Sequence, residues 1–210
     1  MVESVGLRER KKRRTRAALI AAAVGLMFEK GYDETTVAEI AEAADVSRRT
    51  FFAYFPGKSD VLFADGWRRV DAVLQIISER RPDESVADIL LRALEGVVIS
   101  ESSERDLSGH LASQRVRLIK ETPALQAALV RHMFEAQQQV AQALVAVFPE
   151  LPESDALAAV GALLGALLNS TLTVLAQGPD DDELLLSVQR AARVAVNGIA
   201  SLPEAGPVKG

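Results

Sequence analysis

Apolar side chains recur every three or four residues along most of this chain, and no segment shows the two-residue alternation of a half-buried strand. Near the N-terminus they form one stripe of a helix expected over residues 17–30, at Ile20, Val24, Met27 and Phe28. The same spacing continues to the C-terminal region. We therefore expect an all-α protein of about nine helices, over residues 17–30, 36–44, 48–54, 59–80, 84–99, 105–120, 123–148, 154–177 and 180–202.

Polar residues and prolines mark where several of these helices begin. Thr36 and Glu39 fit a capping box, in which the threonine hydroxyl accepts the amide of the third helical residue and the glutamate reaches back to the threonine amide. Ser47 is a second N-cap after a polar turn. Thr122 followed by Pro123 signals a further helix start, because proline suits the first helical position.

Residues 35–58 are predicted to form a helix-turn-helix. The second short helix, 48–54, turns Phe51 and Phe55 inward and presents donors outward, at Ser47, Arg48, Arg49, Thr50 and Tyr54. Arginines at a helix start suit a DNA major groove, because the forked guanidinium matches O6 and N7 of guanine. The alternative from these residues alone is a solvated helical hairpin with two surface arginines.

The run from about Arg16 to Leu62 resembles the DNA-binding domain of the tetracycline-repressor-like (TetR/AcrR) family of bacterial regulators. The matching features occur in order along the chain: Phe28-Glu29-Lys30-Gly31-Tyr32, Thr35-Thr36-Val37, Ile40-Ala41, Val46-Ser47, Thr50-Phe51-Phe52, Tyr54-Phe55, and Lys58 before Val61-Leu62. One position departs from the pattern, because the family most often carries tyrosine where this chain has Phe52. The resemblance implies a ligand-released repressor that binds a near-palindromic operator as a homodimer.

The DNA contacts expected on this basis divide by chemistry. Arg48 and Arg49 are candidates for base edges, and Phe52 for a thymine methyl group. Phosphate contacts are expected from hydroxyls and cations of the same segment, with Ser47 at the helix start: Thr36, Thr50, Tyr54 and Lys58. Arg13 and Arg14 would add contacts from a basic arm.

The distribution of charge supports this division of the chain. The net charge is -5, yet residues 1–60 carry 11 Lys and Arg against 9 Asp and Glu, which leaves 13 against 20 for the remainder. Residues 1–16 hold seven basic side chains and are expected to be a flexible arm on DNA, or alternatively a solubilising tail. We expect a DNA-binding domain at 17–58, a ligand-binding and dimerisation domain at 59–202, and a tail at 203–210.

Catalytic chemistry has no visible support in the sequence. The chain has no cysteine, and its two histidines, His110 and His132, lie in no recognisable catalytic or metal-binding motif. We expect no enzyme activity, no metal and no cofactor.

The helices after residue 59 are expected to enclose a small-molecule effector. The candidate wall residues are mostly apolar with a few polar anchors, one of them Arg115 or Arg117 for an anion: Phe63, Trp67, Leu111, Arg115, Met133, Phe134, Gln137 and Asn169. The run Arg115–Gln126 is also similar to actinobacterial members related to mycofactocin regulators. That similarity points to an apolar or acyl-like effector.

The last two predicted helices are apolar over more than one stripe, which predicts pairing with a second copy of the chain. The expected interface combines small residues of 154–177 with a face of 180–202: Ala158, Ala162, Gly165, Ala166 and Asn169, then Leu185, Val188, Ala192, Ala195 and Ile199. An internal core pair remains the alternative.

Residues 156–176 approach the length of a membrane span, but Asn169, Ser170, Thr171 and Thr173 argue against one. We expect a cytoplasmic protein that associates with DNA; the competing class is a helical lipid- or small-molecule-binding module whose basic tail contacts membranes.

Overall fold

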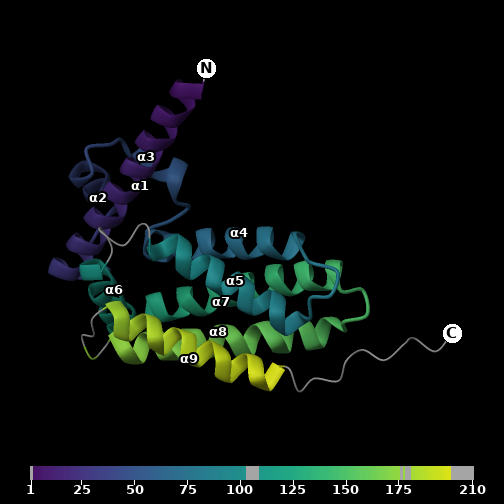
Figure 1. The fold of residues 1–210 in the computed structure, drawn as a ribbon. Helices are drawn as coiled ribbons and strands as arrows, with labels where there is room; N and C mark the ends of the chain where they lie inside the picture. The colour runs from purple at the N-terminus through teal and green to yellow at the C-terminus, as the bar shows by residue number, and fades with distance from the viewer. Residues whose placement is uncertain (1, 103–108, 176, 178–180, 200–210) are drawn as a thin grey trace. The chain divides into compact units, whose positions relative to one another are not determined.

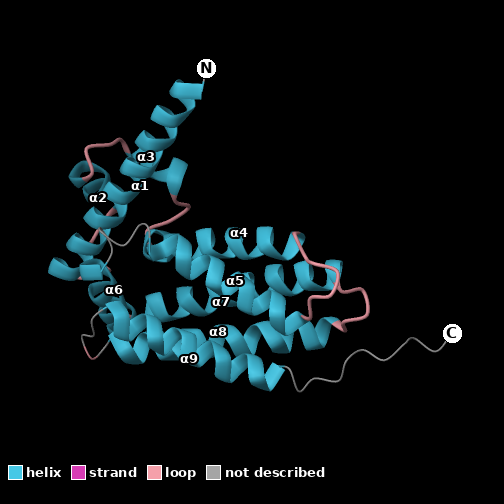
Figure 2. Ribbon diagram, viewed as in Figure 1, coloured by secondary structure: helices cyan, strands magenta, loops and turns pink. Residues whose placement is uncertain are grey.

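The computed structural model describes residues 2–102, 109–175, 177 and 181–199, and in this part of the chain helices are joined by loops and there is no strand (Figures 1 and 2). Nine α-helices and one 3-10 helix follow in order: α1 Val2–Lys30, α2 Val37–Ala43, α3 Arg48–Tyr54, η1 Ser59–Phe63, α4 Ala64–Ser78, α5 Val86–Ser102, α6 Gly109–Glu121, α7 Pro123–Val147, α8 Glu153–Leu175 and α9 Asp181–Ile199. The expected all-α fold with about nine helices is confirmed. The predicted tail at 203–210 lies outside the described residues.

The chain forms two compact units. Unit 1 comprises residues 1–65 and 114–129, and unit 2 comprises residues 66–113 and 130–210. The division differs from the expected boundary at residue 58, because the end of α6 and the start of α7 belong to the same unit as the helix-turn-helix.

The core of unit 1 is built where α1, α2, α3 and η1 meet. α1 packs on α2 and η1, and α2 packs on α3. The fully or nearly fully buried side chains come from all four elements: Leu19, Ala23, Val24, Met27, Ile40, Ala41, Phe51, Val61 and Leu62. Phe28, expected on the inward stripe of α1, is instead 40% exposed, with the guanidinium of Arg117 lying 5.4 Å from its ring centroid.

α1 begins at Val2, so the residues expected to form a flexible arm are helical. Two effects explain why these residues are helical. Lysine and arginine are good helix formers. In addition, extending an existing helix avoids the cost of a new nucleus, and residues 17–30 supply a packed helix to extend. Arg10, Arg13 and Arg14 remain exposed along it, which keeps their charges in water.

The core of unit 2 is formed by α4, α5, α7, α8 and α9. α9 packs on both α8 and α5. The buried side chains are aliphatic apart from one phenylalanine: Val70, Ile77, Ile89, Leu90, Ala136, Val140, Ala141, Leu144, Phe148, Ala156, Ala159, Val160, Leu163, Ala192 and Val196. The helix expected at 59–80 starts as the 3-10 helix η1 and ends at Ser78. α7 starts at Pro123, as expected.

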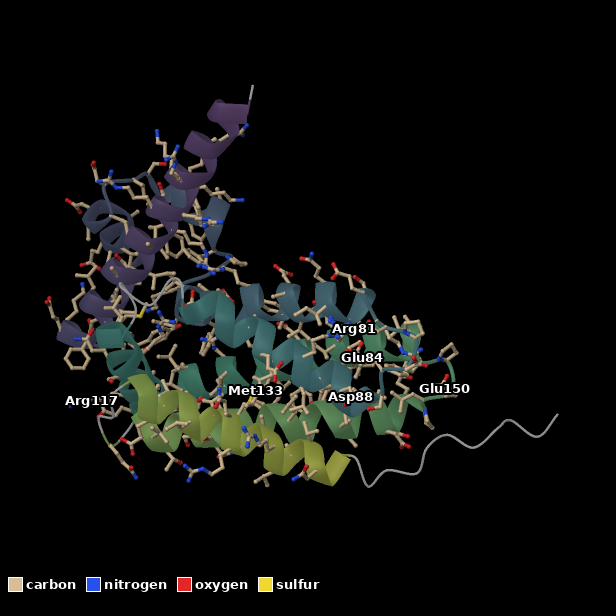
Figure 3. All side chains as sticks on the ribbon, viewed as in Figure 1. Arg81, Glu84, Asp88, Arg117, Met133 and Glu150 are labelled. Carbon is tan, nitrogen blue, oxygen red and sulfur yellow. The ribbon has the colours of Figure 1, made fainter. Side chains whose placement is uncertain are left out.

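An ion pair with a buried carboxylate joins the loop between α4 and α5 to α5 in unit 2. Arg92 donates through Nε to Glu84 Oε1 at 2.5 Å and through Nη2 to Glu84 Oε2 at 2.8 Å. The Arg81 amide also donates to Glu84, and both of these residues are labelled in Figure 3. The hydrogen bond from Arg92 lowers the pKa of Glu84 to about 2. Glu84 is only 8% exposed, so this pair stabilises the folded state wherever the carboxylate is ionised.

Candidate nucleic-acid interface

The first helix of the pair, α2, is fixed at its start by the predicted capping box. Thr36 Oγ1 accepts a hydrogen bond from the Glu39 amide at 3.3 Å, and Glu39 Oε2 accepts one from the Thr36 amide at 2.9 Å. Lys30, the last residue of α1, also donates to the Glu39 carboxylate. That hydrogen bond, with those from Thr36, lowers the pKa of Glu39 to about 2. The Thr36 hydroxyl, expected to contact phosphate, donates to this carboxylate at 2.7 Å.

The turn between α2 and α3 is a Schellman motif. The Val46 amide donates to the Ala41 carbonyl at 2.9 Å, and the Asp45 amide donates to the Glu42 carbonyl at 3.0 Å. Asp45 occupies the left-handed region with φ 53°, a conformation that aspartate adopts more readily than most other non-glycine residues. The turn therefore fixes the angle at which α3 leaves α2.

α3 is capped and anchored from its inner face. Ser47 Oγ accepts from the Thr50 amide at 3.0 Å and shares a 2.8 Å hydrogen bond with the Thr50 hydroxyl. Phe51 and Phe55 are buried as expected, with ring centroids 5.7 Å apart. These contacts hold the short helix rigidly, which matters because seven residues alone would not stay helical in water.

The outer face of α3 combines two cations with an aromatic ring. Arg48 and Arg49 are exposed, and Phe52 lies one helical turn later on the same side. The Phe52 ring is 52% exposed and stands edge-on to buried Phe51, with centroids 5.4 Å apart. Thr50 and Tyr54 are partly buried. The helix thus presents guanidinium donors and an apolar ring, the groups that recognise guanine edges and thymine methyl groups.

Lys58 has a different set of contacts from the phosphate contact predicted for it. Its ammonium donates to the backbone carbonyls of Tyr32 at 2.5 Å and Thr35 at 2.9 Å, with Asp33 at 3.4 Å. The Nζ atom also lies 4.0 Å from the centroid of the Tyr32 ring. In this structure the ammonium is therefore paired with backbone carbonyls of unit 1.

Asp65, in the first turn of α4, joins two arginines from distant parts of unit 1. Arg16 of α1 donates to Asp65 Oδ1 at 3.3 Å and also to the Ala64 carbonyl. Arg115 of α6 donates to Asp65 Oδ2 at 2.8 Å. Sequence reasoning missed this cluster because its members lie 49 and 50 positions apart.

The effector candidates are divided between the two units. Phe63 and Arg115 belong to unit 1, and the others belong to unit 2: Trp67, Leu111, Met133, Phe134, Gln137 and Asn169. Trp67 stacks edge-on against His132, with ring centroids 5.4 Å apart, a contact that the sequence did not predict. Phe134 is 62% exposed and Asn169 bonds to Gly165 of its own helix, so these two face outward. Gln137 donates to the Leu157 carbonyl at 2.8 Å. The His110 side chain lies outside the described residues.

The predicted pairing surface is only partly available to another chain. Ala158 and Ala162 of α8 are exposed, and Gly165, Ala166, Val188 and Ala195 are half-buried. Ala192, by contrast, is 1% exposed in the core of unit 2, so it contributes to the chain's own packing and not to a partner surface. The side chains of Leu185 and Ile199 lie outside the described residues.

α8 is long and apolar enough to cross a membrane by length and composition, with a mean hydropathy of 1.8 in an 18-residue window of which 17% is buried. Core helices of soluble proteins meet the same criterion.

Comparisons with known proteins match both parts of the chain. Residues 19–64 match the model of bacterial regulatory proteins of the tetR family, and residues 84–200 match the MftR C-terminal domain. The HTH-type transcriptional regulator TcmR of Streptomyces glaucescens is 34% identical over 143 residues, covering 67% of this chain and 63% of TcmR. The uncharacterized HTH-type regulator YdeS of Bacillus subtilis is 34% identical over 100 residues, 41% of this chain and 47% of YdeS. The chain thus spans less than two thirds of either relative.

Two solved structures share the fold at lower identity. A putative TetR-family regulator from Mesorhizobium loti has a TM-score of 0.54 at 20% identity, covering 91% of this chain and 97% of that one. The fatty acid degradation regulator FadR from Bacillus halodurans has a TM-score of 0.54 at 21% identity, covering 88% and 95%. At these identities the likeness concerns the fold alone.

Proposed function

We propose, from the premise that this chain belongs to the TetR family of bacterial regulatory proteins, that it is a ligand-responsive repressor that binds a near-palindromic DNA operator as a homodimer. The observation that carries the proposal is the outer face of α3, where Arg48, Arg49 and Phe52 stand exposed on a helix whose inner face is buried and capped. Such a protein acts in the cytoplasm, where the chromosome lies. The family is one of regulators, which agrees with the expectation that this chain is no enzyme.

DNA recognition follows from the chemistry of that face. Arg48 and Arg49 offer forked donors to guanine O6 and N7, and Phe52 offers an apolar surface to thymine. Arg13 and Arg14, exposed on α1, would add phosphate contacts that weaken as salt rises. Ser47, Thr50 and Tyr54 flank the face and are proposed to contact the sugar-phosphate backbone.

Pairing of two chains is supported by α8. Most of the apolar window of this helix is not buried within the chain, and Ala158 and Ala162 would allow another helix to approach closely. One recognition helix reads too few base pairs to specify a unique site, whereas two helices in successive major-groove faces read a near-palindrome.

An effector response is supported by the way helices cross the division between the units. α4, α6 and α7 each contribute residues to both units, so a shift in unit 2 is carried along continuous helices. In unit 1, Asp65 links α4 to α1 through Arg16 and to α6 through Arg115. We propose that the protein has one conformation that binds the operator and one that does not. An effector can shift the equilibrium between these two conformations only if it binds them with different affinity. We propose an apolar or acyl-like effector, because partly buried leucines that pack against the core of unit 2 could line an apolar site, among them Leu94, Leu164 and Leu167.

The test is selection of bound fragments from a random DNA pool, followed by titration of the selected duplex. We expect enrichment of an inverted repeat and a complex containing two chains, with Arg48→Ala as the matched loss-of-contact variant. Binding to anionic vesicles with no enriched DNA sequence would refute the proposal in favour of a lipid-binding module. Repetition with cell metabolites tests the effector, and a reporter behind the selected site separates repression from activation.

A further inference from the structure

The loop between α1 and α2 is folded so that its carbonyl groups converge. Gly31 ends α1 with φ 94°, and its amide donates to the Met27 carbonyl at 3.0 Å. Thr35, which is 1% exposed, turns its hydroxyl back onto the Gly31 carbonyl at 2.8 Å. This tight path points the carbonyls of residues 32, 33 and 35 towards one place.

Lys58 occupies that place. Its Nζ donates to the carbonyls of Tyr32, Thr35 and Asp33 at 2.5, 2.9 and 3.4 Å, and it lies over the Tyr32 ring. An ammonium group has three N–H donors and no acceptor, so the three carbonyls match its full capacity. Lys58 follows α3, whereas the three carbonyls lie in the loop before α2. This one side chain therefore links the segment after α3 to the segment before α2.

We propose that Lys58 is a positioning residue for DNA recognition and not a phosphate ligand. It holds the loop that precedes α2, while the Glu39 capping box holds the start of α2 and the Schellman turn sets α3 on α2. Without the clamp, the outer face of α3 loses its fixed angle to the rest of unit 1. The inference rests on the proposed DNA-binding function.

Replacement by arginine separates the two roles. Arginine binds phosphate at least as well as lysine, because its planar fork makes two parallel hydrogen bonds. The same planar group cannot direct three donors from one atom towards three converging carbonyls. A phosphate ligand is therefore rescued by Lys58→Arg, and a clamp is not.

The experiment measures binding of the full-length wild type, Lys58→Arg and Lys58→Met to the selected operator and to a random duplex. Salt is varied, at a temperature where circular dichroism shows all proteins folded. Both variants should lose operator affinity by about tenfold, the worth of one good base contact, with little change on random DNA. The slope of log affinity against log salt should stay at the wild-type value. Arg14→Ala is the control that lowers the slope by about 1.

Three results would overturn the clamp: wild-type operator affinity in Lys58→Arg, a slope lowered by about 1 in Lys58→Met, or unchanged affinity in both variants. A purely structural role would lower the unfolding temperature and leave the ratio of operator to random affinity intact. The Lys58 ammonium should also give a nitrogen-15 signal protected from solvent exchange in the free protein, with Lys11 as the exposed control. That signal tests the clamp even if the wild type binds no DNA, in which case the proposed function itself fails.

Discussion

The exposed ring of Phe52 should make operator binding sensitive to a single methyl group. The perturbation is replacement of thymine by uracil, which removes only the C5 methyl, at the base pairs facing α3. Because Phe52 is 52% exposed and stands edge-on to buried Phe51, its ring is already placed and needs no ordering on binding. The matching change in the protein is the variant Phe52→Ala.

The magnitude follows from the area that leaves water. Burying one methyl-sized group contributes about 0.8 kcal/mol, which is about fourfold in affinity per half-site and about fifteenfold for both. A phenylalanine buries about 200 Å², so covering its exposed half contributes at most about 2.5 kcal/mol. Phe52→Ala should therefore cost more than the thymine change, and should remove most of the effect of uracil.

The assay is a four-way cycle of wild type and Phe52→Ala, each titrated with thymine and uracil versions of the selected operator at fixed salt. A coupling of about 0.8 kcal/mol per half-site is expected. If uracil weakens Phe52→Ala as much as it weakens the wild type, Phe52 does not touch the methyl group. A uracil placed outside the selected half-sites serves as the control and should change nothing.

Three other features support direct tests. Arg48→Ala should cost about 1–3 kcal/mol on the operator and relax preference at one base pair, measured with single-base operator variants; an equal loss on random DNA would contradict base reading. Because Arg92 holds the pKa of Glu84 near 2, stability should be full above about pH 4.5 and fall by at most about 3 kcal/mol towards pH 2. Glu84→Gln should make the unfolding free energy, measured by urea titration, less dependent on pH in this range. An unchanged dependence on pH would refute the role given to Glu84. Asp45→Val should lower the unfolding free energy by about 1–2 kcal/mol and Asp45→Gly should not, because φ there is positive; equal losses would dismiss the backbone argument.

The local contacts of the helix-turn-helix could be predicted from the sequence, because the residues that make each contact lie close together in the chain. The capping box joins Thr36 to Glu39, and Ser47 caps a helix whose amide at Thr50 it binds. The inward pair Phe51 and Phe55 follows from helical spacing alone. In each case the partners are three or four positions apart.

The parts that were missed depend on distant partners or on a balance of free energies. Lys58 meets carbonyls 23 to 26 positions earlier, and no side-chain pattern marks a backbone acceptor. Asp65 meets its arginines about 50 positions away in either direction. For α1, repulsion between basic residues favoured a flexible arm, but helix extension from a packed segment outweighed it.

Pairing of two chains through α8, as proposed above, would make the amount of protein a regulatory variable in its own right. If the reading form is a pair, its concentration at low expression varies as the square of the chain concentration, so halving expression removes about three quarters of the pairs. Operator occupancy would then respond to dilution of the protein during growth as well as to the proposed effector. If pairs form through α8, whose apolar window is only 17% buried in the single chain, the cell gains a second control that is set by copy number.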